Sequence, residues 1–557
     1  MEKVWLKSYE EGVPAEINPD AYHSLVEMID HSCKQFRDQP AFTNMGVTLT
    51  YEDLDRLSRD FAAYLQNDLQ LKKGDRFAIM VPNLLQYPIV MLGILRAGVM
   101  VVNVNPLYTP DELTHQMRDS GAAGILVLEN FANTVQKSLP DVPTLKHVIV
   151  TKVGDLFPPL KAGIIQFVLK YIHKKIPDWN IAHAVMFKSA LAKGKDAPLT
   201  PVPISGDDIA FLQYTGGTTG VSKGAMLTHR NMIANLQQVS IWFASLIKEG
   251  REVVVTALPL YHIFSLTTCL IFTKLGGVNL LITNPRDIKG MLKTLSHAHF
   301  TAIIGVNTLF NAMLKSPLIN KLNFKDLVLA LGGGMAVQRV VAERWQELTH
   351  MPLVEAYGLT ECAPCVTLNP AKLSAYNGSI GLPAPSTDVC ILDDNHEELP
   401  IGQVGELAVK GPQVMKGYWN NPTETAKVFT KDGWLLTGDI ASIDEKGFIR
   451  LMERKKDMIL VSGFNVYPNE IEDIIARLPG VREVAVVASP DEMSGEVPRA
   501  FIVRDNPSLT TDNVIAFCRE RLTPYKIPKH VEFVDELPKT NVGKILRRAL
   551  RDMPLHQ

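Results

Sequence analysis

The sequence predicts an α/β protein with a large, multi-lobed N-terminal domain, built from parallel sheets and a β-rich lobe, and a small α+β C-terminal domain. Three observations predict this class. Short apolar, β-branched runs alternate with helical patterns over most of the chain. Shorter strands and turns replace that pattern at 388–410, and a charged stretch at 453–457 precedes about 100 self-contained residues. At 557 residues, the chain is too long for one hydrophobic core.

The first part of the chain supplies the parallel sheets. Strands that are apolar throughout and lie between helices are typical of parallel sheets covered on both faces. The segment 87–104, YPIVMLGILRAGVMVVNV, predicts a helix that leads into a buried strand. Arg96 interrupts it, and a membrane span needs about 20 uninterrupted apolar residues, so we do not predict a span. The clearest strand candidates are RFAIMV (76–81), GILVL (124–128), VVVTAL (253–258), NLLIT (279–283) and TAIIGV (301–306).

The last part of the chain predicts a separate unit. VCILDD and GELAVKG belong to the β-rich lobe, and ERKKD at 453–457 follows it. We place the boundary there, giving domains at 1–453 and 454–557. The second domain reads as two strands (481–488 and 498–505), a helix (512–522), a strand (530–537) and a basic terminal helix that starts at Ile545.

Composition excludes several classes of protein. The formal net charge is -2, from 57 basic and 59 acidic residues, so the basic footprint of a nucleic-acid-binding protein is absent. Six scattered cysteines do not form a disulfide framework, which favours a reducing, cytoplasmic location. The charged N-terminus MEKVWLKSYEEGVPAEI does not read as a signal peptide. Cys362 and Cys365 form a CxxC pair, but without a second pair or nearby histidines we do not predict a metal or redox site.

The segment 214–224, YTGGTTGVSKG, follows the apolar run IAFLQ and predicts a phosphate-binding loop. Glycines let the backbone approach a ligand closely, and here they stand at positions 216, 217, 220 and 224. Hydroxyl groups and the Lys223 ammonium add donors and positive charge for a triphosphate. The Walker A pattern does not fit, because Ser222 precedes Lys223 and Gly224 follows it. A flexible polar turn is the alternative, which this density of glycine and hydroxyl groups disfavours.

This loop resembles the phosphate-binding signature of the adenylate-forming superfamily, which includes acyl-CoA synthetases, luciferases and peptide-synthetase adenylation domains. Five further motifs in the same order agree with it. The resemblance covers essentially the whole chain and is nearest to bacterial long-chain fatty-acid–CoA ligases, through stretches such as PNLLQYP and KKDMILVSGFNVYPNEIED. The five motifs are AYGLTE (356–361), LTGD (436–439), ERKKD (453–457), SGFNVYPNEIE (462–472) and PKTNVGK (538–544).

The resemblance implies a reaction in two steps: a fatty acid and ATP form an acyl-adenylate and diphosphate, and CoA then displaces AMP. The product would feed fatty acid uptake and β-oxidation. Tyr357 would lie against adenine, Asp439 would accept the ribose hydroxyls, and Arg454 would contact ribose or phosphate. The remaining ATP/AMP-binding residues that it implies are Tyr214, Thr215, Gly216, Gly217, Thr218, Thr219, Gly220, Lys223, Gly333, Gly334 and Gly358.

The resemblance also implies the catalytic group. Lys544 would bridge the carboxylate and the α-phosphate, a task suited to a flexible point charge. Thr360 would touch the α-phosphate, and His262 would line the pocket near the carboxylate, although a histidine after a strand is more often a core residue. Glu361 and Thr218 would hold Mg²⁺, which prefers oxygen ligands and substrate phosphates.

In this family the C-terminal domain rotates between the two half-reactions. By resemblance, Lys456 would be the hinge, and Gly463 and Phe464 would bind CoA, with Gly463 leaving room for the pantetheine arm. A homodimer is an expectation from the family alone.

A basic amphipathic helix at 160–176 indicates peripheral membrane contact. Ile165, Val168, Leu169 and Ile172 share one predicted face, with Lys170 and Lys174 opposite. The alternative is a surface helix whose apolar side packs on the protein body.

Two other functions also stay open: a ligase for another carboxylate or for a carrier-protein thiol, and a non-catalytic acyl- or nucleotide-binding protein. Long-chain fatty acids partition into bilayers, so membrane contact would suit a ligase that acts on them.

Overall fold

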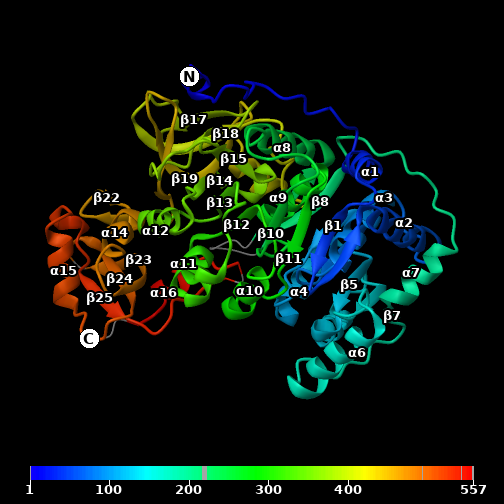
Figure 1. Cartoon of the computed structure of the whole chain (residues 1–557). Coiled ribbons are helices and arrows are strands. Elements are labelled where there is room, and N and C mark those ends of the chain that lie inside the picture. Colours follow the sequence, from blue (N-terminus) through cyan, green and yellow to red (C-terminus); the bar gives the residue numbers. More distant parts are fainter. Residues whose placement is uncertain (1, 216–221, 492, 541, 555–557) are drawn as a thin grey trace.

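The strands predicted between residues 76 and 306 form two large, mainly parallel sheets in the computed structural model (Figure 1). The structure describes residues 2–215, 222–491, 493–540 and 542–554. One sheet has seven strands, which are parallel except for the pair β8·β9. Its order is β7 (Val185–Met186), β6 (His147–Thr151), β5 (Gly124–Leu128), β3 (Arg76–Met80), β4 (Met100–Asn103), β8 (Ile209–Thr215) and β9 (Lys223–Thr228).

The second sheet has nine strands, with antiparallel pairs only at its two ends. Its order is β16 (Leu382–Pro383), β15 (Cys365–Leu368), β14 (Val354–Gly358), β13 (Leu329–Gly332), β12 (Ala302–Gly305), β10 (Val253–Thr256), β11 (Val278–Leu281), β1 (Pro40–Asn44) and β2 (Val47–Thr50).

Buried helices join these two sheets. All residues of α3 (Gln86–Arg96) are buried, and the Tyr87 hydroxyl lies 2.7 Å from Asn103 Oδ1 of one sheet and 2.9 Å from the carbonyl of Leu260 beyond β10 of the other. The segment 87–104 therefore divides into a helix and a strand, as predicted. No helix in the described parts of the chain is long and apolar enough to cross a bilayer. The other helices of this region are α1 (Leu25–Gln35), α2 (Tyr51–Asn67), α4 (Pro110–Ser120), α5 (Ala132–Ser138), α7 (Phe187–Lys195), α8 (His229–Trp242), α9 (Ile263–Lys274), α10 (Ile288–Leu295), α11 (Asn307–Lys315) and α12 (Arg339–Thr349).

The β-rich lobe and the C-terminal lobe follow in the chain and lie at the opposite end of the molecule from α7 (Figure 1). An antiparallel sheet contains β17 (Asp388–Leu392), β18 (Val404–Lys410), β19 (Leu435–Ile443) and β20 (Ile449–Arg454), with α13 (Pro422–Val428) beside it. The C-terminal lobe has its own apolar core around the long pair β23·β24. Its elements are β21 (Ile459–Val461), β22 (Phe464–Val466), α14 (Pro468–Ile475), β23 (Val481–Asp491), β24 (Gly495–Arg504), α15 (Thr511–Arg519), β25 (His530–Phe533) and α16 (Arg547–Arg551).

Several predicted elements of the C-terminal lobe differ in extent, and the strands predicted at 481–488 and 498–505 are longer, at Val481–Asp491 and Gly495–Arg504. The helix predicted at 512–522 ends at Arg519, and the strand predicted at 530–537 ends at Phe533. The terminal helix begins at Arg547 instead of Ile545, because Ile545 forms an antiparallel bridge with Lys539 on the other side of the lysine loop.

The amphipathic segment also differs from its prediction. An α-helix, α6 (Pro159–Phe167), passes into a π-helical turn, Val168–Ile172. Ile165 and Leu169 pack on the protein core, which is the alternative given for this face and not membrane contact. Ile172 is exposed, because the wider π turn rotates it away from that face. A second apolar row faces solvent instead and contains Leu160, Ile164, Phe167 and Tyr171.

Candidate active site

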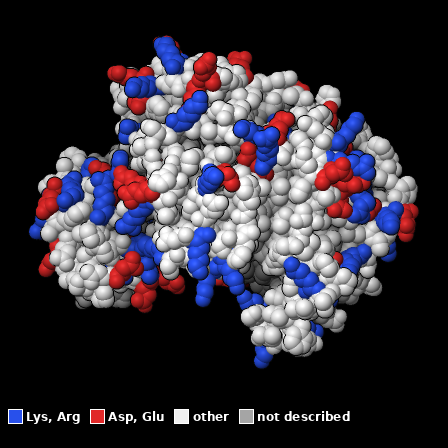
Figure 2. All heavy atoms as spheres, in the orientation of Figure 1, with Lys and Arg blue, Asp and Glu red and all other residues white. Residues whose placement is uncertain are grey.

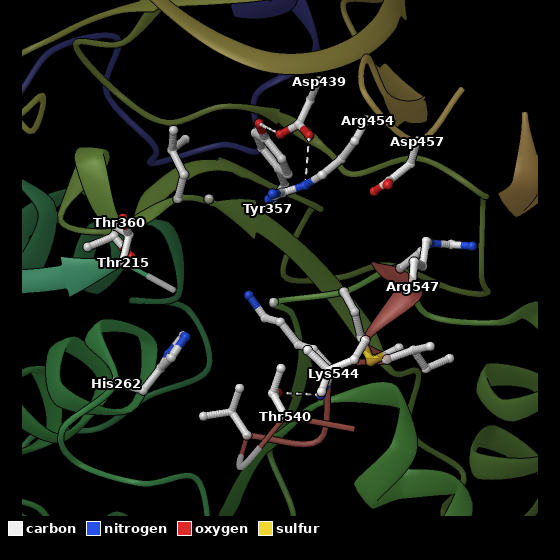
Figure 3. Close-up of a pocket in the computed structure, with 18 of the residues that line it drawn as sticks. Thr215, His262, Tyr357, Thr360, Asp439, Arg454, Asp457, Thr540, Lys544 and Arg547 are labelled. Carbon is white, nitrogen blue, oxygen red and sulfur yellow. Dashed lines mark hydrogen bonds and ion pairs between the residues drawn. The ribbon is translucent and has the colours of Figure 1, made fainter. Parts of the chain in front are cut away.

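A cleft of about 1400 Å³ lies where the two large sheets, the β-rich lobe and the C-terminal lobe meet. The carboxyl ends of β8 and β14 open into it, which is where open α/β sheets bind their ligands. Figure 3 shows side chains from all of these parts pointing into one space. Most of the residues predicted from the motifs line it.

Tyr357, Asp439 and Arg454 form a connected group on one wall (Figure 3). Asp439 on β19 pairs with Arg454 on β20, and Arg454 Nε lies 3.3 Å from Asp439 Oδ1. The Tyr357 hydroxyl donates to Asp439 Oδ2 at 2.5 Å. Burial raises the pKa of Asp439 although Arg454 opposes the shift, and Asp439 in turn raises the pKa of Arg454. Each oxygen of a carboxylate can accept two hydrogen bonds, so this buried group can also accept from vicinal hydroxyl donors such as those of a ribose.

Lys544 reaches into the cleft from the C-terminal lobe, between His262, Thr360 and Tyr357 (Figure 3). A tight loop positions it: its backbone N–H donates to Thr540 Oγ1 at 3.1 Å, and Thr540 N–H donates to its carbonyl at 2.7 Å. Gly543 has φ +84°, and a Cβ there would lie 2.7 Å from Thr308 Oγ1, so the loop requires glycine. Burial and Arg454 lower the pKa of Lys544 to about 8.

Glu361 and Tyr418 connect the AYGLTE motif to the phosphate loop. The Tyr418 hydroxyl donates to Glu361 Oε1 at 2.6 Å, and Lys223 Nζ lies 5.0 Å from the centre of the Tyr418 ring. Lys223 also forms an ion pair with Glu424 of α13. Among the described residues no cluster of three or more His, Cys, Asp or Glu could hold a metal ion. Mg²⁺ would therefore have to be bound mainly by substrate phosphates, with Glu361 as one protein ligand.

The ends of the phosphate loop are held together. Ser222 Oγ donates to the Thr215 carbonyl at 2.7 Å, and β8 and β9 pair directly on either side. Tyr214 lines the cleft, but its hydroxyl donates to Asp119 Oδ2 at 2.5 Å. The predicted ligands Gly216, Gly217, Thr218, Thr219 and Gly220 lie outside the described residues.

The predicted glycines beside the cleft have close neighbours. Gly334 has φ +74°, and a Cβ there would come within 3.5 Å of Lys544 Cε. A Cβ on Gly358 would lie 2.1 Å from the Pro364 carbonyl oxygen, and one on Gly333 would lie 3.0 Å from that of Ala356. A side chain at Gly333 or Gly358 would therefore crowd the neighbouring backbone, whereas at Gly334 the positive φ favours glycine.

His262 is the N-cap of α9, where its Nδ1 accepts the Phe264 N–H at 3.3 Å. Burial, with a smaller contribution from Lys544, lowers the pKa of His262 to about 3. Its imidazole is therefore neutral at neutral pH, and because Nδ1 accepts a hydrogen bond, the ring carries its proton on Nε2 and can donate one hydrogen bond in the cleft.

The residues predicted for the second half-reaction lie differently. Lys456 lines the cleft in the turn after β20. Gly463 has φ +86° with open space where a Cβ would be, and Phe464 is 56% exposed and stacks on Tyr525 at 4.9 Å. Neither residue is part of the cleft lining in this arrangement of the lobes.

The sequence analysis did not predict several residues of the site. Glu355 Oε1 accepts the Val337 N–H at 3.0 Å, and burial raises the pKa of Glu355 to about 8. A single acidic residue in the apolar run PLVEAYG was the available signal. Tyr418, Glu424 and Arg547 had no comparable signal, because their roles come from contacts with residues distant in the chain.

Comparison with known proteins agrees with this geometry. Family models described as AMP-binding enzyme and AMP-binding enzyme C-terminal domain match residues 29–419 and 470–544. The chain is 58% identical to the long-chain-fatty-acid–CoA ligase of Escherichia coli O6:H1, over 99% of this chain and 98% of that protein.

Solved structures share the fold. The ATP-bound MatB of Rhodopseudomonas palustris superimposes with a TM-score of 0.80 at 27% identity, covering 95% of this chain and 98% of that one. The anthranilate CoA ligase AuaEII, in complex with anthranoyl-AMP, gives a TM-score of 0.85 at 22% identity, covering 96% and 98%, and supports the fold alone. The two family matches and the relative at 58% identity establish that the chain belongs to the AMP-binding enzyme family of the adenylate-forming superfamily.

Proposed function

We propose that this protein is an AMP-forming long-chain fatty acid–CoA ligase. The carboxylate oxygen of the acid attacks the α-phosphorus of ATP and diphosphate leaves. The CoA thiolate then attacks the acyl carbon and AMP leaves. The observation that carries the first step is the position of Lys544, whose side chain reaches into the cleft that Tyr357 and Asp439 line. The length of the acyl chain rests on the 58% identity to the Escherichia coli ligase.

The cleft contains the groups that the first step needs. Adenylation brings an anionic carboxylate to an anionic triphosphate, so the protein must supply positive charge and alignment rather than a nucleophile. Lys544, Arg454 and Lys223 supply charge at three points of the cleft. Mg²⁺ held by Glu361, by Thr218 and by phosphate oxygens would neutralise the leaving diphosphate. Thr360 and the neutral His262 supply uncharged hydrogen-bonding groups.

We assign the domains as 1–453 and 454–557, with Lys456 as the hinge. The second step needs a different surface from the first, so the C-terminal lobe would turn about Lys456 and bring Gly463 and Phe464 toward the cleft to bind CoA. Their present exposure and the open space beside Gly463 support a role in a second arrangement. A homodimer stays a prediction.

The decisive test is AMP release from ATP, with and without CoA, across fatty acids of increasing chain length. AMP formation that requires both a long-chain acid and CoA, and that Lys544→Ala abolishes, is the expected result. Formation of acyl-adenylate without use of CoA would point to a carrier-protein thiol, and a preference for another carboxylate would replace the substrate class. No AMP with any acid would favour a non-catalytic binding protein.

We also propose that the protein works at the cytoplasmic face of the inner membrane, through the segment around α6. Its outward apolar side chains are 57–79% exposed at Leu160, Ile164 and Phe167. Residues 156–177 contain four lysines and no acidic residue, which suits an anionic bilayer. In Figure 2 charges of both signs are scattered over the body of the protein. The lobe at the bottom of the view, which contains α6 in Figure 1, is largely uncharged with a few basic side chains.

Flotation with anionic and neutral vesicles tests this contact. Ile164→Asp should reduce binding to anionic vesicles, and the control Val404→Asp, an exposed apolar residue of β18, should not. Equal flotation of both variants and the wild-type protein would remove the proposal.

A further inference from the structure

A group of buried charges lies behind the lysine loop, at the base of the C-terminal lobe. Arg547, three residues after Lys544, is its centre. Its guanidinium donates to both carboxylate oxygens of Glu472, to the Val486 carbonyl at 2.7 Å and to Asn469 Oδ1 at 2.8 Å. These partners all follow residue 456 in the chain, so they tie the lysine loop to the body of its own lobe.

Glu453 joins this group from the other side of Lys456. It is the next-to-last residue of β20 in the β-rich sheet and is 3% exposed. Its Oε2 lies 3.7 Å from Arg547 Nη2 and accepts the Asn469 N–H at 3.1 Å. Next to it, Asn469 Nδ2 donates to the Met452 carbonyl at 3.3 Å. These contacts connect residues before Lys456 with residues after it.

Other contacts between the lobes lie nearer the surface. Thr308 Oγ1 donates to the Gly543 carbonyl at 3.1 Å, and Lys315 Nζ lies 3.2 Å from Asp505, whose side chain is about half exposed. Exposed ion pairs contribute little, whereas leaving a buried charge without its partner is costly. The contacts of Glu453 are therefore those most sensitive to the position of the lobe.

We propose that Glu453 is a latch residue that holds the C-terminal lobe with Lys544 in the cleft, acting through Arg547 and Asn469, and that this latch opens before the thiol step. It is a positioning residue, because it touches Arg547 and Asn469 rather than the reacting atoms. The proposal rests on the two-step reaction proposed above.

The geometry separates what a rotation breaks from what it keeps. Turning the lobe about Lys456 removes Asn469 and Arg547 from Glu453 and exposes its carboxylate to water. The pairs of Arg547 with Glu472 and of Arg551 with Asp457 stay intact, since all four residues follow Lys456. The lobe thus keeps these two ion pairs in both positions, whereas Glu453 loses its partners from across the hinge.

Glu453→Ala tests the latch, because alanine removes the carboxylate that accepts the Asn469 N–H and faces Arg547. In single-turnover assays, formation of acyl-adenylate from ATP and fatty acid should slow roughly tenfold. Conversion of supplied acyl-adenylate by CoA should change less than about twofold, since a weakened latch does not hinder that step. Asn469→Ala, which removes an uncharged contact across the hinge, should give the same split. The control Glu520→Gln, an exposed carboxylate of the same lobe, should change neither step.

A distance measurement makes the test independent of turnover. All six native cysteines are buried, so spin labels at Val404→Cys and Met493→Cys, both exposed, report on the two lobes selectively. The wild-type protein should give one main distance, and Glu453→Ala should add a second, broader one. An unchanged distribution, or equal slowing of both half-reactions, would overturn the latch. A shifted distribution in a protein that forms no adenylate would instead leave the latch standing and remove the proposed function.

Discussion

Replacing Asp439 by Asn probes the nucleotide site through a single buried charge. Asp439 is 2% exposed and contacts the Tyr357 hydroxyl and Arg454. Asparagine has the same shape and keeps one acceptor oxygen, so the change removes charge without opening a cavity. The Tyr357 hydroxyl can still donate to the remaining oxygen.

The size of the effect follows from the hydrogen bonds that the substitution weakens. A hydrogen bond to a charged group is worth about 1.5–3 kcal/mol and a neutral one about 0.5–1.5 kcal/mol. If both ribose hydroxyls bind here, the loss is about 2–3 kcal/mol, which weakens ATP binding roughly 30- to 150-fold. Tyr357→Phe is the matched control: it frees an Asp439 oxygen for the ribose, so ATP affinity should change little while stability falls by about 1.5–3 kcal/mol.

Titration calorimetry with ATP, and separately with inorganic pyrophosphate, measures the prediction. Pyrophosphate has no ribose, so Asp439→Asn should bind it as the wild-type protein does. If ATP affinity changes less than threefold, or if pyrophosphate affinity falls as much as ATP affinity, then Asp439 does not accept the ribose hydroxyls. Thermal unfolding of both variants checks the stability of the folded protein.

Three further predictions concern charges in and beside the cleft. Because the pKa of Lys544 is lowered to about 8, its charged fraction falls as pH rises through that value, so kcat/KM for adenylate formation should decline above pH 8. Lys544→Arg stays charged, so any residual activity should lack this limb. Burial raises the pKa of Glu453 from 4.5 to about 7, so between these pH values the folded state binds a proton that the unfolded state does not, and the free energy of unfolding should fall as pH rises. Chemical denaturation of Glu453→Gln should show a flatter dependence of this free energy on pH. A dependence identical to that of the wild-type protein would contradict the shift. Glu424→Ala releases Lys223 for the triphosphate, so the KM for ATP should fall by up to about fivefold in steady-state assays, and a higher KM would show that Glu424 assists binding.

Several features could be predicted because their signals are local. The five strand runs named from apolar, β-branched patterns all became strands of the two large sheets, within two residues at each end. The segment 87–104 split into α3 and β4 because Gly98 has φ +70°, which ends the helix. The motifs predicted that Lys544, Tyr357, Asp439 and Arg454 share one site, and in the structure all four line the same cleft.

The incorrect predictions concern interactions that the local sequence pattern does not contain. The helical face predicted at 160–176 assumed regular 3.6-residue turns, and the π turn moved Ile172 outward. The helix predicted to 522 stopped at Arg519, where the Cys518 carbonyl accepts the N–H groups of both Arg521 and Leu522 and turns the chain. Short polar segments of this kind carry too little periodicity to fix an element's end.

The sequence by itself determined the class of fold and predicted the phosphate loop and the chemical groups of the cleft, because glycine spacing, apolar runs and motif order are properties of neighbouring residues. Only the tertiary structure decided which charges meet. Glu453 and Arg547 are 94 positions apart, as are Asp457 and Arg551, and Lys223 and Glu424 are 201 apart. Whether such pairs form depends on how separate lobes pack, and burial then sets their strength, since the same pair is worth little in water and much when its charges lose their hydration.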